Sequence, residues 1–249
     1  MIFISRIATT ARSAVVGALI GISSVCLVAA CGSAGESATR STPASPTAAG
    51  APAAPTRPGG VYGDPEADAR YWVQQSTEDT CGIASVAAVV GEVTGTAPTE
   101  QQVIKLAQDT PSSIRDGAIY LPTGDPGHET DKGGIDMADI VVLLAHYGIK
   151  SKMTYDAHPE EVGLPKLEEY LGANRKVIAW VNSGTILNSN DQRTSPDHFL
   201  VVTGVDTNSD TVHLNDPYAD HGDTKVSVSK FMTAWKIGQE SIVVTASPS

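Results

Sequence analysis

Cys81 stands at a position where a thiol could act as a nucleophile on a carbonyl group. Asp79 and Thr80, directly before it, are favourable helix N-cap residues. An apolar stripe with helical spacing follows at Ile83, Val86, Ala87 and Val90. This pattern places Cys81 in the first turn of a buried helix, where the helix dipole and unpaired N–H groups favour the thiolate. Because free cysteines are often simply buried, an inert structural Cys81 stays open as an alternative.

A thiol nucleophile needs a base, and His198 is the histidine best placed to be one. The other five histidines are His128, His146, His158, His213 and His221. His198 opens an apolar run, a polar turn near Asn208 follows, and a second apolar run leads to Asp216, which together predict an antiparallel hairpin. The register about this turn places Asp216 close to the position opposite His198 and His213 in the middle of the hairpin. The hairpin is thus predicted to bring an imidazole and an orienting carboxylate together at its open end.

Motifs for metals and for a serine nucleophile are not found beyond the N-terminal region. Asp206, Asn208 and Asp210 resemble the start of a calcium loop. Thr211 and Pro217 stand where that loop needs glycine and glutamate, so calcium is not expected. Zinc is not supported either, because there is one cysteine and no histidine pair at helical distance. No Gly-x-Ser-x-Gly elbow is present, and we expect no cofactor and no metal.

The ordered set of these residues resembles the C39-like cysteine peptidases over the range from about Trp72 to Pro217. The residues that carry the resemblance are Gln75, Cys81-Gly82-Ile83-Ala84, Asp197-His198-Phe199-Leu200-Val201-Val202 and Leu214-Asn215-Asp216-Pro217. The resemblance implies a papain-like fold, and it implies a role in the oxyanion hole for Gln75 rather than Gln74. Double-glycine leader peptides are not carried over as substrates, because the family members that trim them are fused to export transporters and no such part is expected here.

The acidic balance of the chain argues against nucleic acid as a partner. With 28 acidic and 17 basic side chains among 249 residues, the formal charge is −11 with the histidines neutral. Binding to phosphates by counterion release needs a positive face, and the longest basic clusters are Arg175-Lys176 and Lys150-Ser151-Lys152. An acidic surface suits an exported soluble domain, and attraction of cationic substrates is the alternative interpretation.

The N-terminal segment has the features of a bacterial lipoprotein leader. Arg6 and Arg12 are the only charges before residue 36, and an apolar, small-residue run from Val15 to Ala30 precedes Cys31. This run is short for a membrane span, which needs about 20 residues, and the cysteine after two small residues resembles a lipobox. Residues 1–30 are therefore predicted to be a signal peptide and Cys31 the lipidated residue, with a short uncleaved anchor helix as the alternative. Either interpretation places the rest of the chain outside the cytoplasm, at the cell membrane.

Residues 31–65 are predicted to be a disordered stalk and residues 66–249 the folded domain. Ala, Gly, Pro, Ser and Thr make up 28 of the 34 residues from 32 to 65, a composition that cannot bury enough apolar surface to offset chain entropy. The remaining 184 residues (249 − 65) suffice for one domain. Because Cys26 lies in the leader and Cys31 at the lipidation site, Cys81 is the only cysteine of the domain and no disulfide is expected within it.

The elements that must position the site follow an α+β order, with N-terminal helices packed on a C-terminal antiparallel sheet. Besides the helix at Cys81, helices are predicted at Thr99–Gln108, Met137–Tyr147 and Glu160–Leu171. Strands are predicted at Lys176–Val181, Phe199–Val205, Thr211–Leu214, Lys225–Val228 and Ser241–Thr245. In a papain-like arrangement, the nucleophile's helix would pack against the sheet that carries the histidine and the aspartate.

The sequence therefore predicts an envelope-tethered cysteine hydrolase that cleaves peptide or related amide bonds. Cys81 would attack the carbonyl, His198 would accept and return a proton, and Asp216 would orient the imidazole. The expected partners are a peptide or protein substrate and the membrane, through the lipid anchor. Two alternatives stay open, a non-catalytic binding lipoprotein on the same fold and a transglutaminase-like acyltransferase that uses the same residues.

Overall fold

The computed structural model describes residues 59–122, 124–125, 134–189 and 194–247. All of them fall within one unit of the chain, Ala53–Ser249. The predicted leader, the lipidation site at Cys31 and residues 31–58 of the predicted stalk lie outside the described residues. Within the described ranges, no helix is long and apolar enough to cross a membrane.

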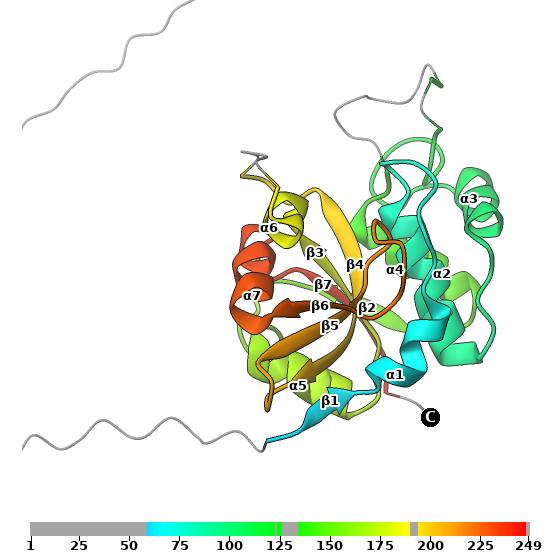
Figure 1. The fold of residues 1–249 in the computed structure, drawn as a ribbon. Coiled ribbons are helices and arrows are strands. Elements are labelled where there is room, and N and C mark those ends of the chain that lie inside the picture. Colours follow the sequence, from blue (N-terminus) through cyan, green and yellow to red (C-terminus); the bar gives the residue numbers. More distant parts are fainter. Residues whose placement is uncertain (1–58, 123, 126–133, 190–193, 248–249) are drawn as a thin grey trace, which may run out of the picture. The chain divides into compact units, whose positions relative to one another are not determined.

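In the described residues, a short strand and a run of helices come first, and the remaining strands follow with further helices between some of them (Figure 1). The helices are α1 (Pro65–Asp68), α2 (Cys81–Thr94), α3 (Glu100–Asp109), α4 (Met137–His146), α5 (Leu164–Gly172), α6 (Ser183–Leu187) and α7 (Val228–Ile237). The strands are β1 (Val61–Gly63), β2 (Ser151–Thr154), β3 (Val177–Val181), β4 (His198–Asp206), β5 (Thr211–Asn215), β6 (Thr224–Ser227) and β7 (Ile242–Thr245). A 3₁₀ turn at Ala69–Tyr71 follows α1 directly.

The strands form one antiparallel sheet in the order β2-β7-β3-β4-β5-β6, and β1 pairs with the end of β4. Side chains alternate between the two faces of a strand, and here both faces are apolar. On one face, Ile178 of β3 and Val201 of β4 join a hydrophobic core. On the other face, the neighbouring residues Val177 and Leu200 join a second core. The central strands are therefore buried on both sides, which fixes their register, because a slip by one residue would exchange the two faces.

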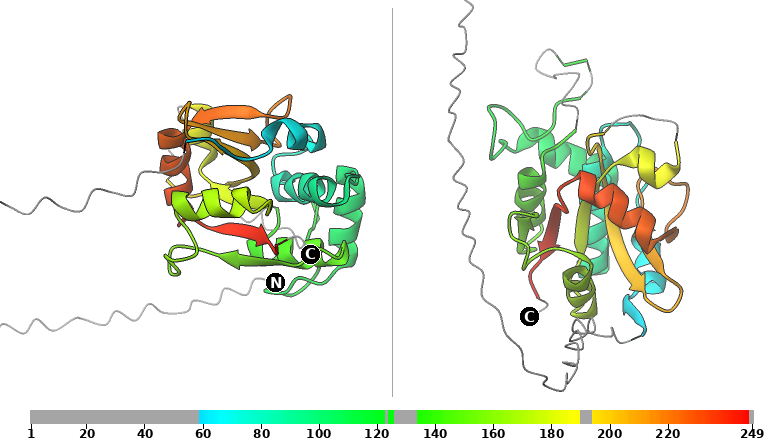
Figure 2. Two further views of the ribbon diagram at one scale, coloured as in Figure 1. Left: turned by 90° about the horizontal axis from the view of Figure 1, so that it is seen from below. Right: turned by 90° about the vertical axis from the view of Figure 1, so that its left-hand side faces the viewer.

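Helices cover both faces of this sheet (Figures 1 and 2). The helices α2, α3 and α4 share a core with one face, in which Ile83 and Leu143 are fully buried. The helices α5, α6 and α7 share the core on the other face, in which Phe231 and Trp235 are fully buried. The predicted α+β class is confirmed, and the N-terminal helices do pack on the later sheet. The sequence did not predict that α5, α6 and α7 form a second helical layer on the other face of the sheet.

The folded part begins before residue 66, where the sequence analysis placed its boundary. Val61–Gly63 forms β1 and pairs with residues 204–206 of β4, and Asp64 caps α1. At Gly63 φ is +90°, and a Cβ there would lie 2.2 Å from Thr203 O, so this strand pairing requires glycine. Composition could not show this, because a three-residue strand adds little apolar signal to a segment rich in small residues.

Two other boundaries also differ from the prediction. The helix α5 begins at Leu164 rather than Glu160, because Gly163 adopts a φ of +86° and Pro165 stands in the first turn. Val228 begins the helix α7 instead of ending a strand, since Ser227 Oγ accepts a hydrogen bond from Lys230 N and caps the helix. The helices α6 and α7 and the edge strand β2 are absent from the prediction.

A cluster of polar side chains is buried between α1, α2 and the sheet. It consists of Asp68, Glu92, Lys176 and Asn215, and we refer to it as the buried polar cluster. Lys176 Nζ lies 2.6 Å from Asp68 Oδ2, and both side chains are at most 9% exposed. Asn215 Nδ2 donates to Asp68 O at 2.9 Å and to Glu92 Oε1 at 3.2 Å. Burial first, and then the charge of Asp68, raise the pKa of Glu92 well above its ordinary value, which favours its protonated form.

We predict that Glu92→Gln gains stability relative to the wild type as the pH rises. The native state holds a proton at Glu92 that the unfolded chain releases near pH 4.5, so the contribution of this group to stability falls as the pH rises from there toward the raised native pKa. Glutamine is neutral throughout and lacks this loss. Urea unfolding of both proteins at about pH 5 and about pH 9 measures the difference. An equal difference at both pH values would contradict a protonated Glu92.

Candidate active site

Cys81 is the first residue of α2, and its sulfur contacts β4. Thr80 is the N-cap residue, and its N–H and Oγ1 both donate to Thr77 O, which closes the turn before the helix. Cys81 is 6% exposed and forms no disulfide. Its Sγ accepts a hydrogen bond from Phe199 N–H at 3.5 Å. The helix thus begins where the sequence predicts, and the thiol lies against the residue that follows His198.

Apolar side chains pack closely around the residue after the cysteine. A Cβ at Gly82 would lie 2.8 Å from Ile135 Cγ1 and 3.1 Å from Phe199 Cδ2, so only glycine fits without a shift of these side chains. Trp180 stacks on Phe199 with ring centroids 5.9 Å apart, directly across the β3–β4 pair. Trp180 is half-buried and packs against the core on this face, whereas Trp235 is fully buried in the core on the far face. The low polarity of this side of the site strengthens electrostatic interactions at the sulfur.

The strands β4 and β5 bring His198 and Asp216 together. His198 is the first residue of β4, and its Nε2 lies 2.7 Å from Oδ1 of Asp216, the residue that follows β5. The hairpin contains a β-bulge at Thr203, because the register shifts by one residue between Val202 and Gly204. The single register predicted for the whole hairpin therefore does not hold past Thr203. The imidazole and the carboxylate nevertheless meet, as predicted.

Interactions around His198 favour its protonated form. The residue is 5% exposed, and burial lowers its pKa, but hydrogen bonds with the side chains of Asp216 and Cys81 raise the pKa to about 10. Because Nε2 bonds to Asp216, Nδ1 is the ring nitrogen left for Cys81. At neutral pH both ring nitrogens carry a hydrogen, and an imidazolium beside a sulfur stabilises the thiolate. The arrangement therefore suits a thiolate–imidazolium pair.

Asp216 is held by hydrogen bonds from the main chain and from an indole. It is 1% exposed, and its Oδ1 also accepts from Tyr218 N–H at 2.9 Å. Its carbonyl oxygen accepts from Trp72 Nε1 at 2.7 Å and from Ala219 N–H at 3.1 Å. Trp72 has no predicted role from the sequence. A tryptophan in a mostly polar segment is a signal that could have pointed to it, because a buried indole N–H needs an acceptor.

Gln75 lies on the loop that leads to α2. Its backbone N–H donates to Pro217 O at 3.0 Å, and its Nε2 donates to Thr77 O at 2.8 Å. An amide NH₂ has two hydrogens, so the second has no acceptor among the described residues. Gln74 is exposed, and its Nε2 donates to Ala219 O at 3.3 Å. The structure thus distinguishes the two glutamines, and the oxyanion role of Gln75 stays a prediction.

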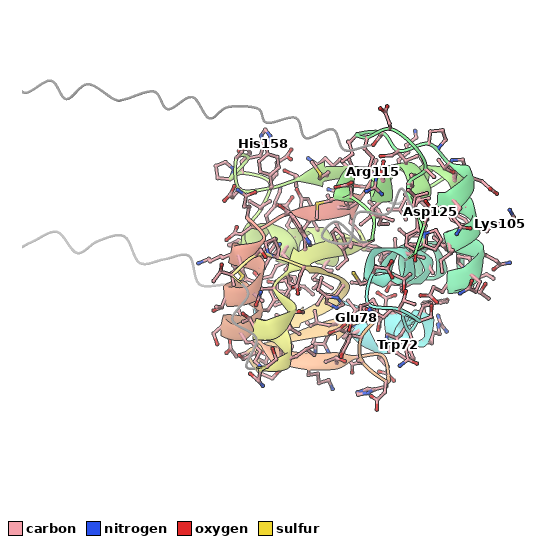
Figure 3. The ribbon with its side chains drawn as sticks, turned by 90° about the horizontal axis from the view of Figure 1, so that it is seen from above. Trp72, Glu78, Lys105, Arg115, Asp125 and His158 are labelled. Carbon is pink, nitrogen blue, oxygen red and sulfur yellow. The ribbon has the colours of Figure 1, made fainter. Side chains whose placement is uncertain are left out.

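The other histidines have different surroundings. Those in the described residues are His146, His158, His213 and His221. His213 and His221 each bond to a nearby aspartate, at 2.5 Å in both cases. His158 is exposed and lies on a different side of the domain from Trp72 (Figure 3). His128 lies outside the described residues. Among the described residues, His198 is thus the histidine that shares a hydrogen bond with Cys81.

Metal ligands do not gather in the described part of the chain. No group of three or more histidine, cysteine, aspartate or glutamate side chains is arranged there to hold a metal ion. In the segment that resembles a calcium loop, the carboxylate of Asp206 accepts from Asn208 N–H at 2.9 Å and from Ser209 Oγ at 2.6 Å. These bonds close the turn between β4 and β5, which accounts for the residue pattern.

Comparison with known proteins defines the family. The Peptidase_C39 like family matches residues 67–242 of the chain. The chain belongs to this family, and the predicted papain-like α+β fold is confirmed. The family and the fold support a peptidase-type function.

Three relatives illustrate how far the similarity extends. Uncharacterized proteins of Mycobacterium bovis and Mycobacterium tuberculosis are each 40% identical over 198 residues, which cover 75% of this chain and 85% of theirs. The solved structure of a candidate C39-like peptidase from Bacillus anthracis is 18% identical, covers 72% of this chain and 94% of its own, and superimposes with a TM-score of 0.48.

We predict that iodoacetamide alkylates Cys81 at about pH 6, where an ordinary thiol of pKa about 8.5 is almost fully protonated. The His198 imidazolium stabilises the thiolate, so His198→Ala should slow this labelling about tenfold or more. Mass spectrometry of timed samples gives the rates. His158→Ala removes an exposed histidine on a different side of the domain (Figure 3) and should leave the rate unchanged. Equal rates in the wild type and His198→Ala would contradict the pair.

Proposed function

We propose that this domain is a cysteine peptidase that cleaves peptide or related amide bonds through Cys81, His198 and Asp216. The observation that carries the proposal is the buried 2.7 Å hydrogen bond between His198 Nε2 and Asp216, with the other ring nitrogen left for Cys81. Membership of the C39-like family supports a peptidase-type reaction. The three residues come from three segments, and each segment is anchored by its own packing or hydrogen bonds.

The reaction proceeds in two halves. The Cys81 thiolate attacks the carbonyl carbon, and the C–N bond breaks as the His198 imidazolium gives its proton to the leaving amine. Neutral His198 then takes a proton from a water molecule, whose oxygen attacks the thioester carbonyl. The carboxylic acid leaves, and the thiolate–imidazolium pair is restored. Asp216 keeps the ring in one orientation and stabilises its charge in both halves.

Two donors would stabilise the oxyanion in this mechanism. Cys81 N–H belongs to the first turn of α2, where backbone N–H groups have no partner inside the helix. The second donor is the remaining hydrogen of Gln75 Nε2, whose first hydrogen is fixed on Thr77 O. A donor that is already oriented needs no reorganisation when negative charge develops on the carbonyl oxygen.

The proposal also places the enzyme at the cell envelope. Val28-Ala29-Ala30-Cys31 supports lipidation at Cys31 after removal of residues 1–30. The composition of the segment from residue 31 to β1 supports a spacer between the lipid and the domain. The substrate would then be a peptide or an amide of the envelope.

We predict that the purified domain turns over members of peptide and envelope-derived amide libraries, and that Cys81→Ala and His198→Ala abolish this activity. Asp216→Asn should be intermediate, because it keeps the shape of the side chain and loses its charge. Gln75→Ala should lower kcat about 10²-fold if its amide serves the oxyanion, whereas the exposed Gln74→Ala should not. Saturable binding without turnover would establish a binding lipoprotein instead. Product release only after addition of an amine would establish an acyltransferase.

We predict that the full chain partitions with membranes and that Cys31→Ser abolishes lipid attachment. Acyl chains on Cys31 would provide the anchor, and stable anchoring takes more than one chain. Mass spectrometry of the N-terminal peptide measures the modification. Residues 59–247 should stay folded in the variant, which circular dichroism checks. An unmodified Cys31 in the exported wild-type protein would overturn the lipoprotein assignment.

A further inference from the structure

Asn215 directly precedes Asp216, and its side chain closes the loop that carries the aspartate. Its Oδ1 accepts a hydrogen bond from Asp223 N–H at 3.2 Å, across the base of that loop. Its Nδ2 donates in the other direction, to Asp68 O at 2.9 Å and to Glu92 Oε1 at 3.2 Å. Asn215 is 1% exposed, so water does not replace these bonds. These partners require a side chain with one acceptor and two donor hydrogens at position 215. An amide supplies them, and a carboxylate does not.

The partners of Asn215 are themselves fixed. Asp68 is paired with Lys176 at 2.6 Å inside the buried polar cluster. Glu92 extends from α2, the helix that begins with Cys81. The Asn215 amide therefore ties the loop that carries Asp216 to the helix that begins with Cys81. This connection is independent of the His198–Asp216 bond.

The loop also packs closely against the segment before Cys81. A Cβ at Gly222 would lie 3.0 Å from Asn215 Oδ1 and 3.0 Å from Trp72 Cβ. Trp72 in turn donates its indole hydrogen to the Asp216 carbonyl. With Asn215 on one side and Trp72 on the other, the position of the Asp216 main chain is determined from both sides.

We propose that Asn215 is a positioning residue of the active site, which holds the Asp216 carboxylate against His198 by anchoring its loop to the buried polar cluster. This rests on the proposed function in so far as it takes Asp216 as the acid of the triad. Asn215 contacts neither substrate nor reacting atoms and acts through Asp216. Without it, the loop base opens, the Asp216–His198 bond lengthens, and the imidazolium loses stabilisation.

The test is the titration of His198 by NMR in protein with isotope-labelled histidine, with the signal assigned by its loss in His198→Gln. Asn215→Ala should raise the acid dissociation constant of His198 about tenfold, which is one pKa unit. Glu92→Ala removes one of the two acceptors of Asn215 Nδ2 and should raise this constant by less. Glu92→Gln keeps an acceptor oxygen and should titrate like the wild type.

Thr99→Ala is the control for general destabilisation, because it removes the capping box of α3 and touches neither β5 nor the cluster. It should leave the His198 titration unchanged. A folded Asn215→Ala protein with the wild-type titration would overturn the proposal. If Asn215→Ala does not fold, equal titrations in Glu92→Ala and Glu92→Gln would overturn it. An unreactive wild-type Cys81 together with a shifted His198 in Asn215→Ala would instead refute the peptidase function and keep the positioning role.

Discussion

The buried hydrogen bond between His198 and Asp216 is the interaction on which the rest of the site depends. With 5% and 1% exposure, neither residue has enough water around it to stabilise its charge, so each depends on its partner and on further donors. Tyr218 N–H supplies one of these donors to the carboxylate, and the Cys81 sulfur faces the other side of the imidazolium. Breaking this pair by removing one member would leave an uncompensated buried charge, which is costly.

The sheet is suited to this task because it is buried on both faces. Helices α2 to α4 pack on one side and α5 to α7 on the other, so β4 and β5 cannot slip without exposing apolar residues (Figure 1). The cysteine comes from the start of a helix in the first core, and the histidine and the aspartate come from adjacent strands. Asp216 lies beyond the end of β5, where ladder hydrogen bonds no longer hold it. There, hydrogen bonds of the Trp72 indole and the Asn215 amide hold the chain in place of strand pairing. These bonds account for the buried polar groups on that side.

Local signals in the sequence predict much of the site and less of its support. The helix start at Cys81, the capping box at Thr99 and the turn near Asn208 follow from short-range patterns, and the structure has the corresponding elements. The Thr80 side chain, however, bonds to Thr77 O and makes no capping hydrogen bond to the helix. The meeting of His198 and Asp216 follows from hairpin register, apart from the bulge at Thr203. The indole bond of Trp72 spans 144 residues, and no periodicity reveals a contact of that kind. The buried polar cluster likewise joins four distant segments, so it becomes visible only in the folded chain.

The most direct test of the account is the pKa of His198 before and after the Cys81 sulfur is blocked as a methyl disulfide. NMR titration of the imidazole in the wild-type domain measures both values. With the free sulfur, the imidazolium should persist to a pKa of about 10, because both Asp216 and Cys81 stabilise it. Blocking the sulfur removes its charge and its hydrogen bond while Asp216 stays in place, so the pKa of His198 should fall by about one unit or more. An unchanged titration would contradict a thiolate–imidazolium pair at this site.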